Sequence, residues 1–150
     1  MPLQSSYTMF QAAGYPGMHA NMEAWNALTR TATATIAFGA PGQRNGDNGV
    51  APLASGGEFI GLAVATHAVT VNGDLYVLGD TVPIADEGVW FGKADAAIAA
   101  GAALNWNSAT GRWTTAATSG TIFAVQGAEA DSAASGADAI FKVRLRRIPS

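Results

Sequence analysis

The stretch from residue 79 to residue 114 places the strongest constraint on the fold. Glycine and proline interrupt its apolar residues at short intervals, a spacing that predicts short strands joined by turns. Three of the four tryptophans of the chain fall in this stretch, at positions 90, 106 and 113. Because burial of one aromatic side chain removes about 150–250 Å² from water, we expect the core to be fixed here.

A hairpin is predicted inside this stretch. Residues 107–111, Asn-Ser-Ala-Thr-Gly, connect two apolar segments, and their number is ordinary for a hairpin loop. Gly111 supplies the positive φ that such a loop needs. Trp106 and Trp113 are then expected to face each other across two antiparallel strands.

The rest of the chain supplies further segments with strand character. Alternating or continuous runs of β-branched and apolar residues favour strands, and Asn72-Gly73 is a strong hairpin signal. The predicted strands cover residues 29–38, 59–64, 69–71, 75–78, 121–125 and 140–146. Together with the tryptophan-rich stretch they predict an all-β fold, either a jelly-roll-like sandwich or a small β-barrel, in which residues 21–150 form a single domain.

Other segments are less regular in pattern. Residues 21–30 carry apolar side chains at a spacing of three, which fits a short helix or an irregular segment. Residues 94–103 are rich in alanine, a good helix former, but the glycine inside them and the short strands around them favour strand and turn. Residues 39–57 are rich in glycine and proline and predict a long loop, and residues 127–139 predict an acidic loop.

Residues 1–20 are predicted to form an extended N-terminal arm. Gly14, Pro16 and Gly17 disfavour a regular element. One interpretation is a frayed terminus. The other is an arm that gains order by lying on a partner, because its several aromatic residues and methionines are unusual for a disordered tail.

Composition limits the classes of partner. Charged residues make up 13% of the chain, against about a quarter in a typical globular protein. Such a neutral surface fits either contacts with other protein chains or a soluble domain that is simply rich in alanine, glycine and threonine. The net charge of −3 supplies no field for nucleic acid. The chain has no cysteine, no evident signal peptide and no apolar run of the ~20 residues that a membrane helix needs, so neither disulfides nor membrane insertion is expected.

Patterns that would support catalysis or metal binding are missing or incomplete. His19 and His67 have no second histidine at a metal-binding spacing. Asp86 and Glu87 are adjacent acids expected at a turn, and adjacency alone does not make a catalytic pair. Residues 45–49 resemble the start of a calcium loop but lack its distal glutamate, and no GxSxG motif occurs. The sequence therefore predicts no enzyme, no cofactor, no metal and no small-molecule substrate.

The last predicted strand, residues 140–146, has a basic face. Alternation along a strand places successive side chains on opposite sides. The apolar set is expected to face the core and the basic set to face outward: Phe141, Val143 and Leu145 against Lys142, Arg144 and Arg146.

This basic face has two compatible interpretations. The charges could protect an edge strand against aggregation. Alternatively, Arg144, Arg146 and Arg147 could form bidentate pairs with acidic groups on a neighbouring subunit.

Several short motifs follow one another along the chain. They are GYPGM at 14–18, IAFG at 36–39, FIGLA at 59–63, GDTVPI at 79–84, GVW at 88–90, AG at 100–101, NWN at 105–107 and TGRW at 110–113. Each is common in β proteins, but their order over most of the chain resembles the tailed-phage capsid cement proteins, also called head decoration proteins. The alanine-rich residues 94–103 depart from the more strand-like pattern of that family.

The resemblance implies a non-enzymatic structural protein of the virion, on the outer surface of an icosahedral capsid. It implies binding to the major capsid protein, bridging of neighbouring capsomers, and assembly as a homodimer or homotrimer. From the apolar turn and the basic strand we expect the partner contacts at Tyr15, Pro16, Gly17, Met18, Arg144, Arg146 and Arg147.

The main alternative is a carbohydrate- or receptor-binding β domain of a phage head fibre or tail. Such a domain would use tryptophans as stacking platforms, so exposed Trp90, Trp106 and Trp113 along a groove would favour it. Buried tryptophans favour the cement protein.

Overall fold

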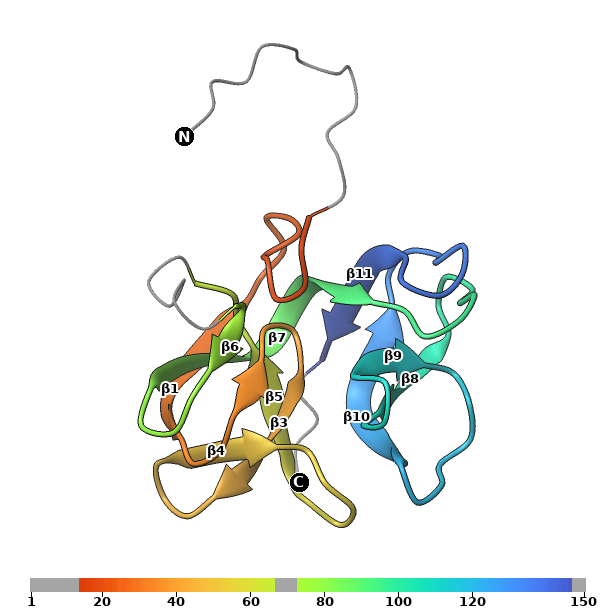
Figure 1. Ribbon diagram of the computed structural model, residues 1–150. Coiled ribbons are helices and arrows are strands. Elements are labelled where there is room, and N and C mark those ends of the chain that lie inside the picture. The colour runs from red at the N-terminus through yellow and green to blue at the C-terminus, as the bar shows by residue number, and fades with distance from the viewer. Residues whose placement is uncertain (1–13, 67–72, 147–150) are drawn as a thin grey trace.

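The computed structural model describes residues 14–66 and 73–146, which contain strands, turns and loops but no helix, so the predicted all-β class is confirmed (Figure 1). The same residues accordingly hold no helix long and apolar enough to cross a membrane. The strands are β1 (Asn26–Ala32), β2 (Ile36–Ala37), β3 (Pro41–Asn45), β4 (Gly49–Pro52), β5 (Phe59–Ala63), β6 (Leu75–Tyr76), β7 (Thr81–Lys93), β8 (Ala103–Asn107), β9 (Arg112–Thr114), β10 (Ile122–Ala130) and β11 (Ile140–Leu145).

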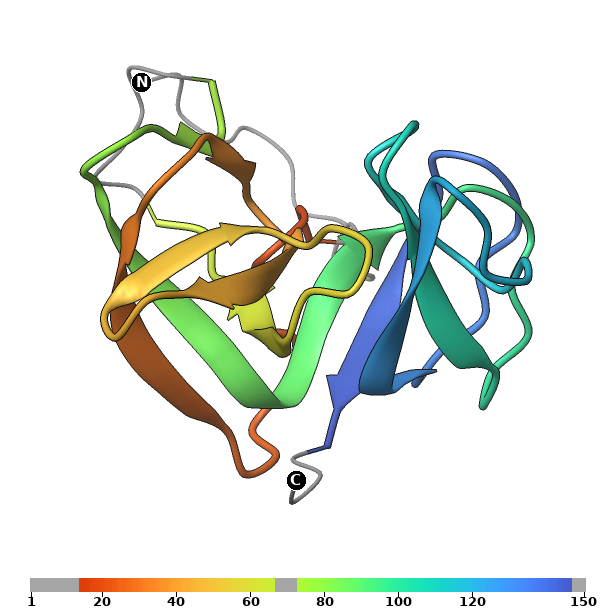
Figure 2. The same cartoon turned by 90° about the horizontal axis from the view of Figure 1, so that it is seen from below.

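Strand β7 is shared by two curved sheets that lie side by side (Figures 1 and 2). In the first sheet the order β1, β4, β3, β5, β7 returns to β1, because β7 also pairs with β1. All pairings in this ring are antiparallel except that of β1 with β4. The ring is a small closed barrel, one of the two architectures that the sequence predicts.

The second sheet begins on the other half of β7 and continues through β11, β10 and β8 to β9. It curls back toward β7, since Ala94 forms an isolated bridge with Trp113. The N–H of Asp95 also donates to the carbonyl of Trp113 over 2.8 Å. A short ladder of β2 and β6 is separate from the main sheet.

Gly88 is the point at which β7 changes partner. Residues up to Glu87 pair with β1, and residues from Gly88 onward pair with β11. The register with β1 shifts just before this point, which leaves Asp86 as a bulge. Gly88 has φ 117°, a conformation that residues with a Cβ rarely adopt, and a Cβ there would lie 2.7 Å from Cβ of Trp25. Glycine therefore allows β7 to pass from the barrel into the second sheet.

One cluster of buried apolar side chains runs through both sheets. Trp90, Trp106 and Trp113 belong to it, with 2%, 8% and 1% of their surface exposed. Trp106 and Trp113 are direct partners in the β8–β9 hairpin, and their rings meet edge to face with centroids 5.3 Å apart. The predicted hairpin, its facing tryptophans and their place in the core are confirmed.

The structure corrects three predicted boundaries where residues thought to be loop or turn are strand. Residues 41–52 of the predicted loop form the β3–β4 hairpin, because the glycine-rich residues 45–49 make a tight turn within regular structure. Residues 81–93 are one long strand rather than several short ones, so Asp86 and Glu87 lie in a strand and not at a turn. Strand β10 continues to Ala130, which removes the first part of the predicted acidic loop.

Other predictions near the N-terminus and in the middle of the chain have mixed outcomes. Residues 21–30 contain no helix, and the predicted strand over residues 29–38 is broken into β1 and β2. The alanine-rich residues 94–103 also form no helix, as predicted. The hairpin expected around Asn72 involves residues 67–72, which lie outside the described residues together with His67.

Candidate functional site

The turn of residues 14–18 is packed where the two sheets meet, against β7 on one side and the segment after β5 on the other. The N–H of Gly17 donates to the carbonyl of Phe91 over 2.9 Å, and the N–H of Phe91 donates to the carbonyl of Met18 over 2.9 Å. Gly17 has φ 82°, and a Cβ there would lie 2.8 Å from the backbone nitrogens of Ala65 and Gly39. Residues 14–20 are therefore held on the body of the domain, residues 1–13 lie outside the described residues, and the N-terminal arm of residues 1–20 stays a prediction.

The turn presents two of its four predicted contact residues to solvent. Tyr15 and Met18 are 44% and 38% exposed, whereas Pro16 is half-buried and Gly17 is buried. The less exposed residues fix the turn on the body of the domain, and Tyr15 and Met18 present apolar side chains to solvent.

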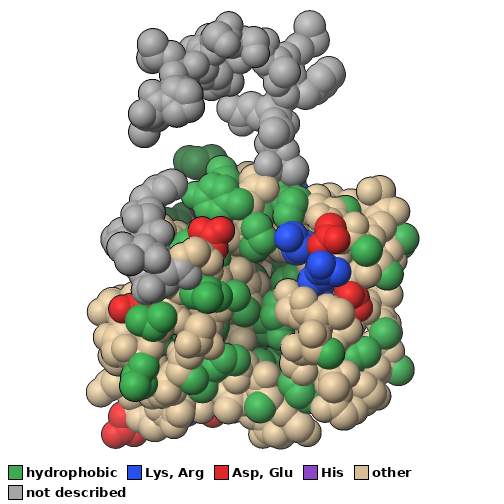
Figure 3. Space-filling view, in the orientation of Figure 1, with side chains coloured by type: hydrophobic (Ala, Val, Ile, Leu, Met, Phe, Trp, Pro, Cys, Tyr) green, Lys and Arg blue, Asp and Glu red, His purple; other side chains and the backbone are tan. Residues whose placement is uncertain are grey.

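A hollow of about 220 Å³ lies beside this turn, between the two sheets. Its walls include Tyr15, Pro16 and Phe38 on one side and Trp106 and Trp113 on the other. Figure 3 shows hydrophobic side chains inside a depression between the two halves of the molecule, with charged side chains gathered to one side of it. We call the surface formed by the turn of residues 14–18 and this hollow the turn–hollow surface.

The tryptophans that reach the hollow show little of their surface. Trp106 and Trp113 are almost fully buried, so neither presents an open ring face on which a sugar could stack. The observation that would favour a carbohydrate-binding domain is therefore not met by these residues.

An aromatic cluster that no local sequence pattern indicates lies near the turn. The rings of His19, Trp25 and Trp90 contact one another, with centroids 5.2 Å apart for His19–Trp25, 4.7 Å for His19–Trp90 and 6.0 Å for Trp25–Trp90. Nε2 of His19 is buried and has no hydrogen-bond partner among the described residues, and burial lowers the pKa of His19. At neutral pH His19 is therefore an uncharged packing residue. The cluster is exposed to solvent at Trp25, which is 55% exposed.

The basic strand β11 is not an edge strand, so that interpretation is wrong: β11 lies between β7 and β10. The alternation along it is confirmed, with Phe141, Val143 and Leu145 buried and Arg146 exposed. Its charges therefore face solvent from the middle of a sheet and have no edge to protect.

The arginines of β11 are paired with acids of the same chain. Nη2 of Arg144 lies 2.6 Å from Oδ1 of Asp131 and 2.8 Å from Oε1 of Glu23. The hydrogen bond with Asp131 is the main cause that raises the pKa of Arg144. Nη2 of Arg146 lies 2.7 Å from Oε1 of Glu129. Arg147 lies outside the described residues.

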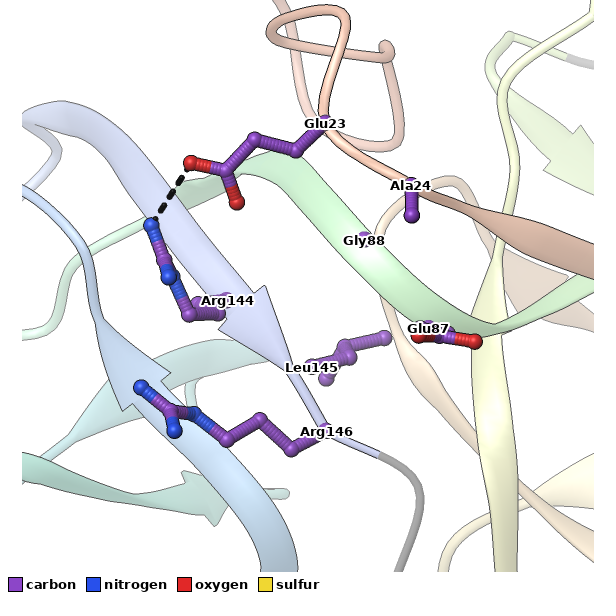
Figure 4. Close-up of a pocket in the computed structure, with 7 residues that line it drawn as sticks. All are labelled: Glu23, Ala24, Glu87, Gly88, Arg144, Leu145 and Arg146. Atoms are coloured by element: carbon purple, nitrogen blue, oxygen red, sulfur yellow. Dashed lines mark hydrogen bonds and ion pairs between the residues drawn. The ribbon is translucent and has the colours of Figure 1, made fainter.

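Arg144 and Arg146 line a groove of about 330 Å³ that is formed by β7, the end of β11 and the loop before β1 (Figure 4). Glu23 reaches Arg144 from the loop before β1, so the pair ties that loop to the second sheet (Figure 4). Arg144 is 28% exposed at its side chain and Arg146 is 63% exposed. Arg146 thus keeps donors available to a partner, whereas Arg144 mainly holds its own chain together.

The described residues bring together no group of three or more His, Asp or Glu side chains that could hold a metal ion. The segment that resembled a calcium loop is the turn of the β3–β4 hairpin. Its backbone is used to connect two strands.

A model of one protein family matches nearly the whole chain. Its description is "Structural cement protein (E217 gp24/Pam3 gp6)", and the match covers residues 3–146. The chain belongs to this family of phage structural cement proteins. The cement protein is therefore a structural component of a phage virion, bound to the capsid, as the order of its motifs predicts.

A solved structure has the same fold. A chain of "The capsid of Myoviridae Phage XM1" superposes on the cement protein with a TM-score of 0.74 and 12% sequence identity, covering 99% of this chain and 100% of that one. No curated protein matches the sequence.

Proposed function

We propose that this cement protein binds the outer surface of the assembled head, contacts the major capsid protein and bridges neighbouring capsomers, without catalysing a reaction. The exposed apolar turn on a rigid base is the observation that carries the choice of surface. Tyr15 and Met18 would make the contact, and Pro16 and Gly17 would hold them in place.

Bridging gives this binding its effect on the shell. A protein that binds only the assembled lattice stabilises it by mass action, by about 2.7 kcal/mol per site at a free concentration of 100 Kd. Many copies on one head repeat that contribution, and contact with two capsomers at once adds avidity.

The proposed basic contact involves fewer arginines than the sequence predicts. Arg146 is its best candidate because its side chain is the more exposed of the two described arginines. Arg147 follows it directly in the sequence and stays part of the same proposed contact. Arg144 would support the contact by fixing Glu23 and Asp131.

The proposal is tested by mixing the purified protein with heads that lack it and measuring the bound copies after sedimentation. The wild type is expected to coat the heads. The double variant Tyr15→Ser/Met18→Ser is expected to bind about tenfold or more weakly, because each apolar contact contributes on the order of 1 kcal/mol.

Leu78→Ser is the matched control for the turn, since Leu78 is 74% exposed and lies outside the turn–hollow surface. It is expected to bind like the wild type. Equal binding by the Tyr15→Ser/Met18→Ser variant and the wild type would remove Tyr15 and Met18 from the contact.

Arg146→Ala is expected to weaken binding to the heads, mainly at low salt. Arg44→Ala also removes an exposed ion-paired arginine and is expected to bind like the wild type.

A further inference from the structure

Strand β1 has an open edge along most of its length. It pairs with β7 from Asn26 to Thr31, but on its other side it pairs with β4 only at Thr31 and Ala32. Figure 2 shows β1 on the outside of the barrel, met by the β3–β4 hairpin only toward its C-terminal end. Residues 27–30 therefore have a strand on one side only, within the described part of the chain.

The hydrogen bonds at the end of β1 show which backbone groups face this edge. The N–H of Ala32 donates to Asp80 just before β7, whereas the N–H of Thr31 donates to Asn48 in the hairpin turn. The backbone N–H and C=O groups of successive residues point to opposite sides along a strand. Those of the even-numbered residues of β1 therefore point to β7. The N–H and C=O of Ala27 and Thr29 then point to the open edge, where the described residues offer them no strand partner.

One large apolar side chain on β1 is exposed at a position where a covered strand would bury it. Leu28 is opposite Ile84, and Ile84 is buried while Leu28 is 46% exposed. The strand reads NALTRTA, with no lysine or proline and with Arg30 as its one charge. Natural sheets usually protect an exposed edge with such residues, so this edge has the character of one that is covered in the assembled protein.

We propose that the open edge of β1 pairs with the same edge of a second copy, antiparallel and about a two-fold axis at Leu28. In this register Ala27 of one copy exchanges both backbone hydrogen bonds with Thr29 of the other, and the same pair is repeated across the axis. This is the antiparallel register in which the two free residues pair with each other, and it leaves Thr31 with its partner in the hairpin turn.

The register also matches the side chains. Leu28 faces Leu28 of the second copy at a position where Cβ atoms lie about 4.5–5.5 Å apart, which extends the barrel's apolar face. Arg30 falls opposite Asn26, so no like charges meet. Nη1 of Arg30 already donates to the carbonyl of Asp47 over 2.6 Å, and Nδ2 of Asn26 donates to Oδ1 of Asp86 over 2.8 Å, so the pairing requires no new side-chain hydrogen bond from either residue.

The chain contains no cysteine, so single cysteines report the pairing directly. Leu28→Cys places two thiols opposite each other at a separation suited to a disulfide. Under mild oxidation at ~10 μM protein, it is expected to form a disulfide-linked dimer on the order of 100-fold faster than Leu78→Cys, because paired thiols have an effective concentration in the millimolar range. Leu78 is the more exposed of the two, so simple collision would give the opposite order.

A second substitution tests the backbone pairing. Thr29→Pro removes an N–H that points to the open edge and not to β7, so the Leu28→Cys/Thr29→Pro variant is expected to lose the fast cross-link while keeping the wild-type circular dichroism. Leu28→Cys/Thr29→Val retains the N–H and is expected to keep the cross-link. If Leu28→Cys cross-links no faster than Leu78→Cys, the proposal is overturned, whatever the oligomeric state and whatever the behaviour of the proline variant.

Discussion

Replacing Trp113 with alanine is expected to lower the free energy of unfolding by about 3–5 kcal/mol, the usual range for truncating a buried tryptophan. Trp113 is 1% exposed, packs edge to face on Trp106, and bridges to Ala94 at the end of β7. Its loss would open the second sheet where that sheet curls back. Because small domains are stable by only about 5–15 kcal/mol, urea unfolding followed by circular dichroism should show the change clearly.

Trp113→Phe is the control for this prediction. The indole nitrogen of Trp113 is buried without a hydrogen-bond partner among the described residues, so phenylalanine removes no hydrogen bond and leaves a smaller cavity. We expect it to cost less than half as much as alanine. A loss below about 1 kcal/mol for Trp113→Ala would contradict the role of this side chain in closing the sheet.

Gly88→Ala is expected to have the next largest effect. A residue with a Cβ at positive φ costs about 1–3 kcal/mol, and here the Cβ would also lie 2.7 Å from Cβ of Trp25 and 3.2 Å from Nε1 of Trp90. The added clash should displace the loop before β1. Urea unfolding gives the stability, and near-ultraviolet circular dichroism reports the tryptophan environment.

Gly79→Ala separates strain from clash. Gly79 also has positive φ, at 92°, but a Cβ there would meet no atom within 4 Å. We expect Gly79→Ala to cost only the backbone strain and to leave the near-ultraviolet spectrum unchanged. If Gly88→Ala and Gly79→Ala lost equal stability and had equal spectra, close packing at Gly88 would not matter for the passage of β7 from one sheet to the other.

The sequence predicts well the features that depend on neighbouring residues. The hairpin between Trp106 and Trp113 follows from a local turn and two apolar flanks, and the alternation in β11 follows from the period of a strand. The order of the short motifs predicts the family because the motifs are spread over most of the chain. These signals require no knowledge of which strands pair.

The errors have a common physical origin in long-range pairing. The length of β7 depends on β1 and β11, which bind its two halves from distant parts of the chain. The docking of Gly17 depends on Phe91 and Ala65, which no pattern within residues 14–20 indicates. The acids that pair with Arg144 lie in two other segments, at Glu23 and Asp131, and no local pattern connects them.

The central claim is that this protein stabilises a phage head by binding its assembled shell. The most direct measurement is the temperature at which heads release their DNA, with and without saturating amounts of the purified protein. We predict release at a higher temperature when the protein coats the heads, and a smaller shift for Tyr15→Ser/Met18→Ser at the same total concentration. Coated heads that release DNA at the same temperature as bare heads would contradict the claim.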